Sequence, residues 1–257
     1  MIELRRLTKR YDAAQQPAVD GVDLDIARGE FLVLVGPSGC GKTTTLFMIN
    51  RLVAPSGGEV LIQGEDISTL DPVALRRRIG FVFQDVGLFP HLTVGENAGI
   101  ALSLMRRPKP EIEARADAVL DQVRLPAQTF RARYPATLSG GQRQRAGLAR
   151  ALAAEPAIML MDEPFGALDP LIRDELAADY RELHAKLGLT TILVTHDMTE
   201  AILLADRIAV MRAGRIEQVA SPREMIAAPA SDFVRSLIET PRRRARALAD
   251  AMGGARP

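Results

Sequence analysis

The chain has 257 residues, 47% of them hydrophobic, and a formal net charge of +1. This length suits one large α/β core with an inserted subdomain, and the near-neutral charge argues against a nucleic-acid partner. The longest apolar runs are about five residues, against the ~20 needed to cross a bilayer, and no signal-type leader precedes them. We therefore expect a cytoplasmic protein, and the single cysteine fits a reducing compartment.

Short apolar segments along the chain predict two kinds of strand. Residues 22–26 alternate apolar and polar side chains, as a half-exposed antiparallel strand does, and residues 2–7 and 60–63 complete a small antiparallel sheet. Continuous apolar runs instead suit a parallel core that is buried on both faces. These runs are Phe31–Val35, Ile79–Phe83, Ile158–Met161, Thr191–Val194 and Ile208–Met211.

The pattern becomes helical between Asp85 and Glu155. Apolar residues recur there at helical spacing, and prolines mark the element boundaries. The apolar positions are Ile112, Val119, Leu120 and Val123, and the prolines are Pro108, Pro110, Pro126 and Pro135. We therefore predict an α/β fold with a mixed, mainly parallel sheet, a small antiparallel β subdomain and an inserted α-helical subdomain.

A glycine-rich loop connects the apolar strand 31–35 to a predicted helix from Thr44 to Leu52. Its sequence, Gly36-Pro37-Ser38-Gly39-Cys40-Gly41-Lys42-Thr43, matches G-x-x-x-x-G-K-[ST] in the strand–loop–helix context of a P-loop NTPase core. Backbone N–H groups in such a loop cradle phosphate oxygens, Lys42 adds positive charge, and the Thr43 hydroxyl can ligate Mg²⁺. The predicted nucleotide-binding residues are Gly36, Ser38, Gly39, Cys40, Gly41, Lys42, Thr43 and Thr44.

Cys40 lies inside this loop, next to a helix N-terminus and Lys42. Both neighbours would lower the pKa of a thiol and raise its reactivity. The alternative is a shielded side chain that fills a variable position of the motif. The sequence leaves these two interpretations open.

Two later segments add polar groups that suit phosphate chemistry. The apolar run 158–161 ends in Asp162 and Glu163, at the edge of the sheet where ligands bind in open α/β folds. Asp162 can hold Mg²⁺, and Glu163 is suited to polarise an attacking water. Upstream, Ser139 has the chemistry of an N-cap for a helix over residues 142–154, and the pair Gly140-Gly141 permits close approach of the backbone to an anion.

The run Leu138-Ser139-Gly140-Gly141-Gln142, upstream of an apolar Asp-Glu strand in a chain with a phosphate loop, resembles the ATPase subunit of an ABC transporter. The resemblance covers residues 2–238 and implies a role for each matching position. Tyr11 would stack on adenine, Asp169 would lie in the loop that crosses to the opposite subunit, and His196 would contact the γ-phosphate. Gln84 would touch Mg²⁺ and sense the membrane partner. His91 and His184 match nothing and are interpreted as structural.

The same resemblance implies a homodimer formed around two ATP molecules. Each site would combine Lys42, Thr43 and Gln84 of one chain with the signature residues of the other. The signature residues are Ser139, Gly140, Gly141 and Gln142. The intact Glu163 predicts an active ATPase, in which the implied catalytic residues are Glu163, His196, Lys42 and Gln84. The implied Mg²⁺ ligands are Thr43, Gln84 and Asp162.

The implied organisation is an ABC ATPase domain over residues 1–240, followed by a basic tail over 241–257. Its nucleotide-binding core would cover 1–84 and 156–240, and its helical signature subdomain 85–155. Tyr134-Pro135 and the run 195–208 resemble bacterial importer subunits, whereas residues 48–52, 66–72 and 84–93 resemble the quaternary-amine importers. Those proteins take up osmoprotectants such as glycine betaine, choline and carnitine.

The implied partners are transmembrane permease subunits and, indirectly, an extracytoplasmic substrate-binding protein, with the chain peripheral on the inner face of the membrane. Uptake of another solute, such as an amino acid or polyamine, and a non-transport ABC-type ATPase stay open as alternatives. Many osmoprotectant ATPases continue into a pair of cystathionine-β-synthase-type domains, and the sequence ends at Pro257 before such a pair. We therefore do not expect ionic-strength gating through those domains. The Arg-rich stretch 241–246 is either a frayed, solvated terminus or a contact with anionic lipid.

Overall fold

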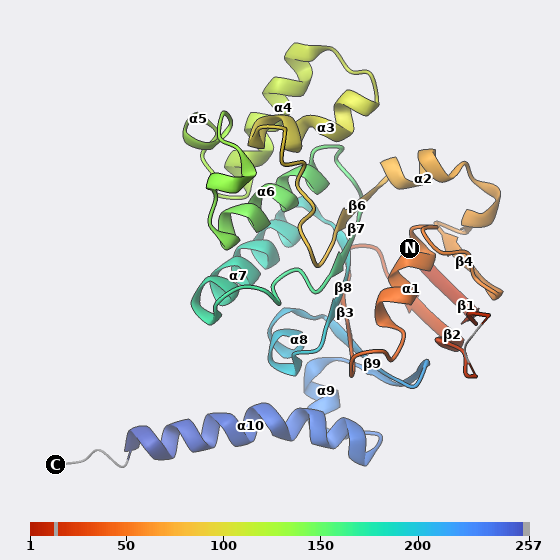
Figure 1. The fold of residues 1–257 in the computed structure, drawn as a ribbon. Helices are drawn as coiled ribbons and strands as arrows, with labels where there is room; N and C mark the ends of the chain where they lie inside the picture. The colour runs from red at the N-terminus through yellow and green to blue at the C-terminus, as the bar shows by residue number, and fades with distance from the viewer. Residues whose placement is uncertain (13–14, 254–257) are drawn as a thin grey trace.

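The computed structural model describes residues 1–12 and 15–253, and it contains two β-sheets with helices around them (Figure 1). The six-stranded sheet has the order β10-β9-β3-β8-β7-β6, and the four-stranded sheet has the order β2-β1-β4-β5. The strands are β1 (Ile2–Lys9), β2 (Val19–Ile26), β3 (Phe31–Val35), β4 (Gly57–Ile62), β5 (Glu65–Asp66), β6 (Ile79–Val82), β7 (Ile158–Asp162), β8 (Thr190–Thr195), β9 (Arg207–Arg212) and β10 (Arg215–Ala220).

The helices alternate with the strands along much of the chain, and helices lie on both sides of the larger sheet. They are α1 (Lys42–Ile49), α2 (Pro72–Arg77), α3 (Val94–Leu104), α4 (Lys109–Gln122), α5 (Ala127–Phe130), α6 (Gly140–Leu152), α7 (Pro170–Leu187), α8 (Met198–Leu204), α9 (Pro222–Ala227) and α10 (Asp232–Gly253), with the 3-10 turns η1 (Ile67–Thr69) and η2 (Pro135–Thr137). Among the described residues, no helix is both long enough and apolar enough to cross a membrane.

The predicted parallel core is confirmed. Strands β6, β7, β8, β3 and β9 run parallel, and every residue of β3, β7 and β8 is buried. Continuous apolar sequences form such strands because helices cover both faces of the sheet. In the register of the pairs, Val35 lies opposite Thr195 and Asp162 lies opposite Val194. The carboxyl ends of three strands therefore meet at one edge, and the loops that follow them form the candidate site.

The predicted antiparallel sheet is also confirmed. Strand β1 pairs antiparallel with β2 and β4, and β2 alternates buried and exposed positions over Val22–Ile26. Its buried face shares a hydrophobic cluster with Leu46 and Ile49 of α1 and with Leu32 and Leu34 of β3. Helix α1 is thus packed between the two sheets, which fixes the direction in which its N-terminus points.

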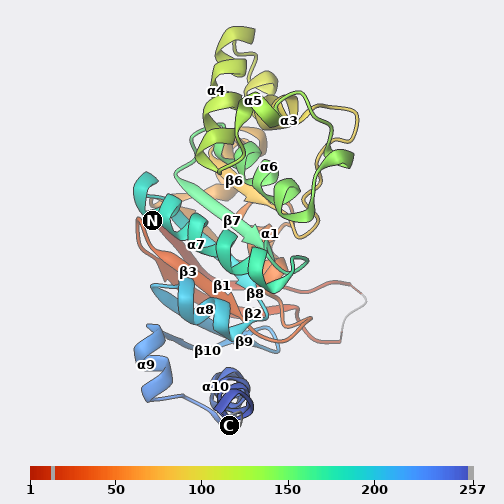
Figure 2. The same cartoon turned by 90° about the vertical axis from the view of Figure 1, so that its left-hand side faces the viewer.

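The predicted helical subdomain contains α3, α4, α5 and α6. Figure 2 shows these helices gathered at one end of the larger sheet, beyond β6 and β7. Helix α3 begins at a capping box, in which the Thr93 side chain accepts from the Glu96 N–H and the Glu96 carboxylate accepts from the Thr93 N–H. Val119 and Leu120 of α4 are fully buried against α3 and α6, as their helical spacing predicts.

Several predicted boundaries are wrong by one to three residues. Helix α1 begins at Lys42, not Thr44, because the loop glycine Gly41 is already its N-cap, and it ends at Ile49, before the left-handed residue Arg51. Strand β6 ends at Val82 and not at Phe83. Strand β10 was not predicted; it pairs antiparallel with β9 at the edge of the sheet, and its side chains are mostly half-buried.

The C-terminal basic stretch is helical in its described part, so of the predicted solvated, frayed terminus the fraying is wrong there, whereas the exposure to solvent is found. Helix α10 continues through Pro241 to Gly253, and the predicted domain boundary after residue 240 falls inside it. Arginine and alanine are strong helix formers and dominate this segment, which outweighs the single proline. Arg242, Arg243 and Arg246 are exposed. Residues 254–257 of the predicted tail lie outside the described residues, and lipid contact stays a prediction.

Candidate active site

The glycine-rich loop between β3 and α1 folds closely around the side chain of Lys42. Lys42 is buried, and its Nζ donates to the carbonyl oxygens of Gly36 at 2.7 Å and Pro37 at 3.0 Å. Gly41 has φ of 107°, and a Cβ at this position would lie 2.2 Å from the Ala18 carbonyl oxygen. A Cβ at Gly36 would lie 2.1 Å from the Met211 carbonyl oxygen. The two glycines are therefore required by close approach of backbone, and at Gly41 also by its left-handed conformation.

A cavity of 390 Å³ opens beside this loop, at the edge where the parallel strands end. Segments that are more than 100 residues apart in the chain line it, because β3, β7 and β8 are adjacent in the sheet. The lining residues are Ala18, Ser38, Gly39, Gly41, Lys42, Thr43, Thr44, Gln84, Glu163 and His196. Nine of the predicted nucleotide-binding and catalytic positions thus meet in one place, and Ala18 is the lining residue that was not predicted.

Thr43 and Asp162 form the oxygen-rich part of the site. The Thr43 hydroxyl donates to Oδ1 of Asp162 at 2.9 Å, and Gln84 lines a groove together with both residues. Burial raises the pKa of Asp162, against a smaller lowering by the Thr43 hydrogen bond. A hydroxyl, one carboxylate and an amide oxygen suit Mg²⁺, which keeps water and phosphate among its ligands. The residues therefore fit the predicted metal, whose charge would also favour the ionised form of the buried Asp162.

Glu163 and His196 form a second polar pair at the cavity. Nδ1 of His196 lies 3.0 Å from Oε2 of Glu163, and the Glu163 N–H donates to the Val194 carbonyl at 2.9 Å. Glu163 has φ of 43°, in the left-handed region that non-glycine residues rarely adopt. Its side chain is 19% exposed and that of His196 is 59% exposed. The strained turn after β7 thus directs a carboxylate into the cavity, where the more exposed imidazole orients it.

A family model described as "ABC transporter" matches residues 19–166, which include the loop, Gln84, the signature and Glu163. The chain belongs to the ABC transporter family. It is 50% identical over 238 residues to the glycine betaine/carnitine/choline transport ATP-binding protein OpuCA of Bacillus subtilis, and 51% identical over 241 residues to the osmoprotectant import ATP-binding protein OsmV of Salmonella typhimurium. These alignments cover 93% of this chain but only 62% and 63% of the two relatives, so the chain spans under two thirds of their length.

The fold is that of solved ABC ATPase cassettes. The dimeric post-hydrolysis structure of the ATP-binding cassette MJ0796, bound to ADP and Pi, superposes with a TM-score of 0.78 at 37% sequence identity. The superposition covers 87% of this chain and 99% of that one. The P-loop NTPase core with an inserted helical subdomain is thereby confirmed.

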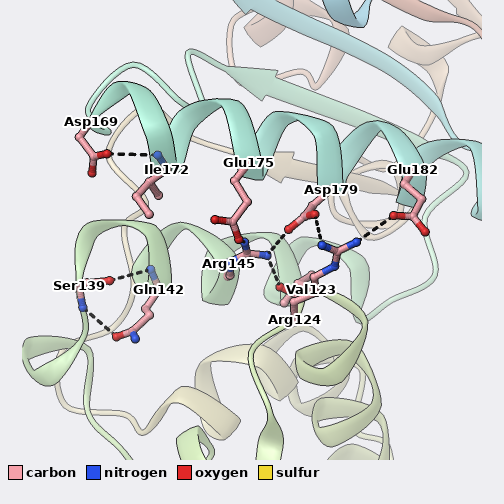
Figure 3. A network of polar contacts seen from close by, with 10 residues as sticks. All are labelled: Val123, Arg124, Ser139, Gln142, Arg145, Asp169, Ile172, Glu175, Asp179 and Glu182. Carbon is pink, nitrogen blue, oxygen red and sulfur yellow. Dashed lines mark hydrogen bonds and ion pairs between the residues drawn. The ribbon is translucent and has the colours of Figure 1, made fainter.

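The other predicted residues of the ABC site lie outside the cavity. Ser139 caps α6, accepting from the Gln142 N–H at 3.3 Å, while Gln142 Oε1 accepts from the Ser139 N–H at 3.0 Å (Figure 3). Ser139, Gly140 and Asp169 are exposed, as is Tyr11 at 44%. The ABC resemblance predicts this separation for the signature, which would serve a second copy. Contact of Tyr11 with adenine stays a prediction.

The hypothesis of a reactive Cys40 thiol is wrong in its premise. Cys40 is 4% exposed, and burial raises the pKa of its thiol, against the smaller lowering by Lys42. A hypothetical Cβ on Gly36 would lie only 2.9 Å from Sγ, so the thiol is wedged beneath the loop. The interpretation of a shielded side chain is the one that the structure supports.

Three further residues have roles in packing or in holding a loop: the two histidines interpreted as structural, and Arg150. His184 is buried against Phe31 and shares a 2.9 Å hydrogen bond with the Thr191 hydroxyl, as its structural interpretation requires, and His91 is exposed beside Phe89. Arg150 of α6 was not among the predicted residues; it donates to the carbonyls of Val86 and Gly87, both at 2.6 Å. Arg150 thereby holds the segment that follows Gln84. An arginine on a mostly buried helix was its only signal.

Proposed function

We propose that this chain is an ATP-hydrolysing subunit of an ABC importer, which powers uptake of an osmoprotectant such as glycine betaine or choline through separate permease subunits. The observation that supports the ATPase activity is the convergence of Lys42, Thr43 and the Glu163–His196 pair on one cavity, with Asp162 hydrogen-bonded to Thr43 beside it. Each of these side chains has a role in transferring a phosphoryl group to water. This reaction depends mainly on positioning and on stabilisation of charge.

The residues divide this work between binding and reaction. Lys42 and the N–H groups at the start of α1 bind phosphate oxygens. Glu163 accepts a hydrogen bond from the attacking water and orients it toward the γ-phosphate, and His196 holds the Glu163 carboxylate in place. Thr43, Asp162 and Gln84 would hold Mg²⁺, whose charge neutralises phosphate oxygens when it is bound. The resulting reaction is hydrolysis of ATP to ADP and phosphate.

An exposed aromatic groove supports the proposed contact with a permease. This groove, of 640 Å³, lies between the core and the helical subdomain and shares Thr43, Gln84 and Asp162 with the metal-binding part of the site. Phe83 is 39% exposed and Phe89 is 42% exposed, although large apolar side chains usually avoid water. The other lining residues are Phe47, Phe81, Asp85, Gly87 and Arg150. An apolar partner segment seated here would touch the loop that carries Gln84, and so reach the site.

The solute and the location are proposed from the relatives. OpuCA is named for glycine betaine, carnitine and choline transport and OsmV for osmoprotectant import, and each matches almost the whole of this chain. A role beside a permease places the chain on the inner face of the cell membrane, with a substrate-binding protein on the other side.

The ATPase proposal is tested with two variants of the purified chain. We expect Glu163→Gln to lower the rate of phosphate release by about 100-fold or more while ATP still binds, because a general base contributes of that order. Lys42→Ala should lose ATP binding itself. Wild-type hydrolysis by Glu163→Gln would contradict the assigned role of Glu163.

The transport proposal is tested separately in a strain lacking this gene. Uptake of radiolabelled glycine betaine and choline should be restored by the wild-type chain and not by Lys42→Ala. An active ATPase without any restored uptake would keep the hydrolytic function and move the solute to amino acids, polyamines or another class.

A further inference from the structure

Helices α6 and α7 are in close contact at their N-termini. A Cβ at Gly141 would lie 2.6 Å from Cγ2 of Ile172, and one at Gly140 would lie 3.5 Å from Cδ2 of Leu168. The N-caps of the two helices are Ser139 and Asp169, and Figure 3 shows both at the same end of the pair. Asp169 caps α7 by accepting from the Ile172 N–H at 3.1 Å. The signature and the Asp169 loop therefore form one continuous surface.

A buried arginine joins the same two helices further along. Arg145 of α6 is 9% exposed; its Nη1 donates to Oδ2 of Asp179 at 2.7 Å, and its Nη2 donates to Oε1 of Glu175 at 2.9 Å. Both acidic residues lie on α7, one helical turn apart. Nη1 also donates to the Val123 carbonyl at 2.9 Å, which brings in the end of α4 (Figure 3). One guanidinium thus joins three elements with both of its terminal nitrogens.

A second arginine, Arg124, also forms ion pairs with acidic residues of α7. Arg124 lies 2.5 Å from Oδ1 of Asp179 and 2.9 Å from Oε2 of Glu182. The Asp179 side chain, only 12% exposed, therefore receives one arginine on each carboxylate oxygen. Glu182 is 73% exposed and contacts Arg124 alone among these arginines. The contact that orders α6 against α7 is accordingly the Arg145–Asp179–Glu175 cluster, not the pair at the surface.

Within this cluster the Arg145 and Asp179 side chains are largely buried, whereas that of Glu175 is 54% exposed. Burial of the Arg145–Asp179 pair is a poor way to gain stability. Removing a guanidinium and a carboxylate from water offsets most of their attraction, and apolar residues of similar volume often stabilise a core better. A planar guanidinium with fixed donors instead sets the relative position and angle of the groups that it joins. The cluster is therefore better suited to fixing the relative position of α6 and α7. The groups positioned in this way are the two exposed N-caps at the end of the helix pair, Ser139 and Asp169.

We infer that Arg145 is a positioning residue of the ATPase cycle, a role that depends on the function proposed above. By holding α6 to α7, it makes the signature and the Asp169 loop move as one unit toward the nucleotide of the opposite copy. Helix α7 follows β7 and Glu163 in the chain, so the unit is also tied to the carboxylate of its own site. Loss of Arg145 should impair the assembled site and spare nucleotide binding by a single chain.

The test uses the full-length chain and four variants. Arg145→Met removes the donors and keeps a long side chain, Arg145→Lys keeps the charge but not the two-nitrogen geometry, and Asp179→Asn weakens the contact from α7. Glu182→Gln is the matched control, because it removes an acid from the same helix that contacts Arg124 instead of Arg145. Four quantities are measured: kcat for ATP hydrolysis, the Kd of a fluorescent ATP analogue at monomer concentrations, Tm, and ATP-driven dimerisation in the Glu163→Gln background by light scattering.

We expect Arg145→Met and Asp179→Asn to lower kcat by about tenfold or more, because small misplacements of reacting groups have effects of this size. Dimerisation should weaken in parallel, while the Kd changes by less than about twofold, since the interaction is made only in the assembled site. Arg145→Lys should be intermediate and Glu182→Gln should match the wild type. If Arg145→Met fails to fold, Asp179→Asn and Arg145→Lys carry the same comparison.

Two results would overturn the inference: a folded Arg145→Met chain with wild-type kcat, or a raised Kd and a lowered Tm that accompany the loss of kcat in proportion, as a merely structural role requires. Failure of the proposed function is recognised differently. In that case the wild type and Glu182→Gln would themselves neither hydrolyse ATP nor dimerise with it.

Discussion

Glu200 is an acidic residue of α8 that lies one helical turn beyond His196. One of its carboxylate oxygens, Oε1, is buried and has no hydrogen-bond partner among the described residues. Burial, with a smaller contribution from the neighbouring Asp197, raises the pKa of Glu200 to about 7, against smaller lowering by Thr195, Arg173 and His196. The folded protein therefore keeps a proton on this group through a pH range in which the unfolded chain has released it.

This shift gives a pH dependence with a definite sign. Between the ordinary glutamate pKa near 4.5 and about 7, rising pH deprotonates the unfolded chain first, so Glu200 lowers the free energy of unfolding across that window. Glu200→Gln removes this loss. We expect the variant to be more stable than the wild type by about 1–3 kcal/mol at pH 8 and by little at pH 4.5 to 5. Urea denaturation at both pH values measures the difference.

The control for Glu200→Gln is Glu182→Gln, which changes an exposed acid on α7. Its effect on the free energy of unfolding should be small and should not depend on pH. A change at Glu200 that is the same at pH 5 and pH 8 would show that the folded protein does not retain the proton.

At the scale of elements, the N-terminus of α1 depends more on Gly41 than on the neighbouring Gly39. Gly41 is the N-cap in a left-handed conformation, and a Cβ there would meet the Ala18 carbonyl before β2. We expect Gly41→Ala to lower the free energy of unfolding by about 2–4 kcal/mol, from backbone strain and the clash together, and to weaken ATP binding strongly. Gly39 has φ of 78° but nothing within 4 Å of its Cβ position.

Gly39→Ala is therefore the matched substitution for Gly41→Ala. It carries only the left-handed penalty of about 1–2 kcal/mol and should fold with a smaller loss of stability. Chemical denaturation and titration with a fluorescent ATP analogue separate the two variants. Equal losses at both positions would mean that the contact with Ala18 does not constrain the loop.

The elements that the sequence predicted are those whose patterns are local. The apolar runs of β3, β7 and β8 are continuous because both faces are buried, and the alternation of β2 reports a sheet with one buried face. Strand β10 escaped prediction because an edge strand with half-buried side chains has neither pattern. The predicted end of α1 was wrong because Arg51 adopts a left-handed conformation that the local sequence does not indicate.

Prediction of the site had the same limit. The loop, its lysine and the Asp-Glu pair are contiguous motifs, so their roles could be assigned from residue types and spacing. The environment of Cys40 depends on how Gly36 approaches Met211 across the sheet, which no local motif records. The acceptors of Arg145 lie more than 25 residues away on α7, and several arginines and acids of both segments could have formed that pair.

At the scale of the whole molecule, the groups of the proposed site occupy two separate surfaces. Lys42, Glu163 and His196 line one cavity, whereas Ser139 and Gly140 lie exposed at the N-terminus of α6, outside it. If the signature serves the nucleotide of a second copy, as proposed above, one copy alone presents an incomplete set of phosphate-binding groups. If ATP joins two copies, a charge placed at the signature should affect the assembly and leave the single chain intact.

Gly140→Asp makes this separation measurable. Gly140 is the first residue of α6, and its Cβ position has ordinary contact distance to Leu168, so a carboxylate there fits and interacts favourably with the helix N-terminus. We expect an unchanged Tm and an unchanged Kd for ATP in the monomer. Hydrolysis and ATP-driven dimerisation should fall by about 100-fold, because the added charge repels the γ-phosphate of the partner's nucleotide at close range.

The neutral isostere Gly140→Asn distinguishes charge from size in this experiment. It keeps the added volume and a good helix-start residue without the negative charge, so it should retain much more hydrolysis than Gly140→Asp. Light scattering with ATP in the Glu163→Gln background reports the dimer, and phosphate release reports the reaction. A Gly140→Asp chain that dimerises and hydrolyses normally, or one that loses ATP binding as a monomer, would contradict a site divided between two copies.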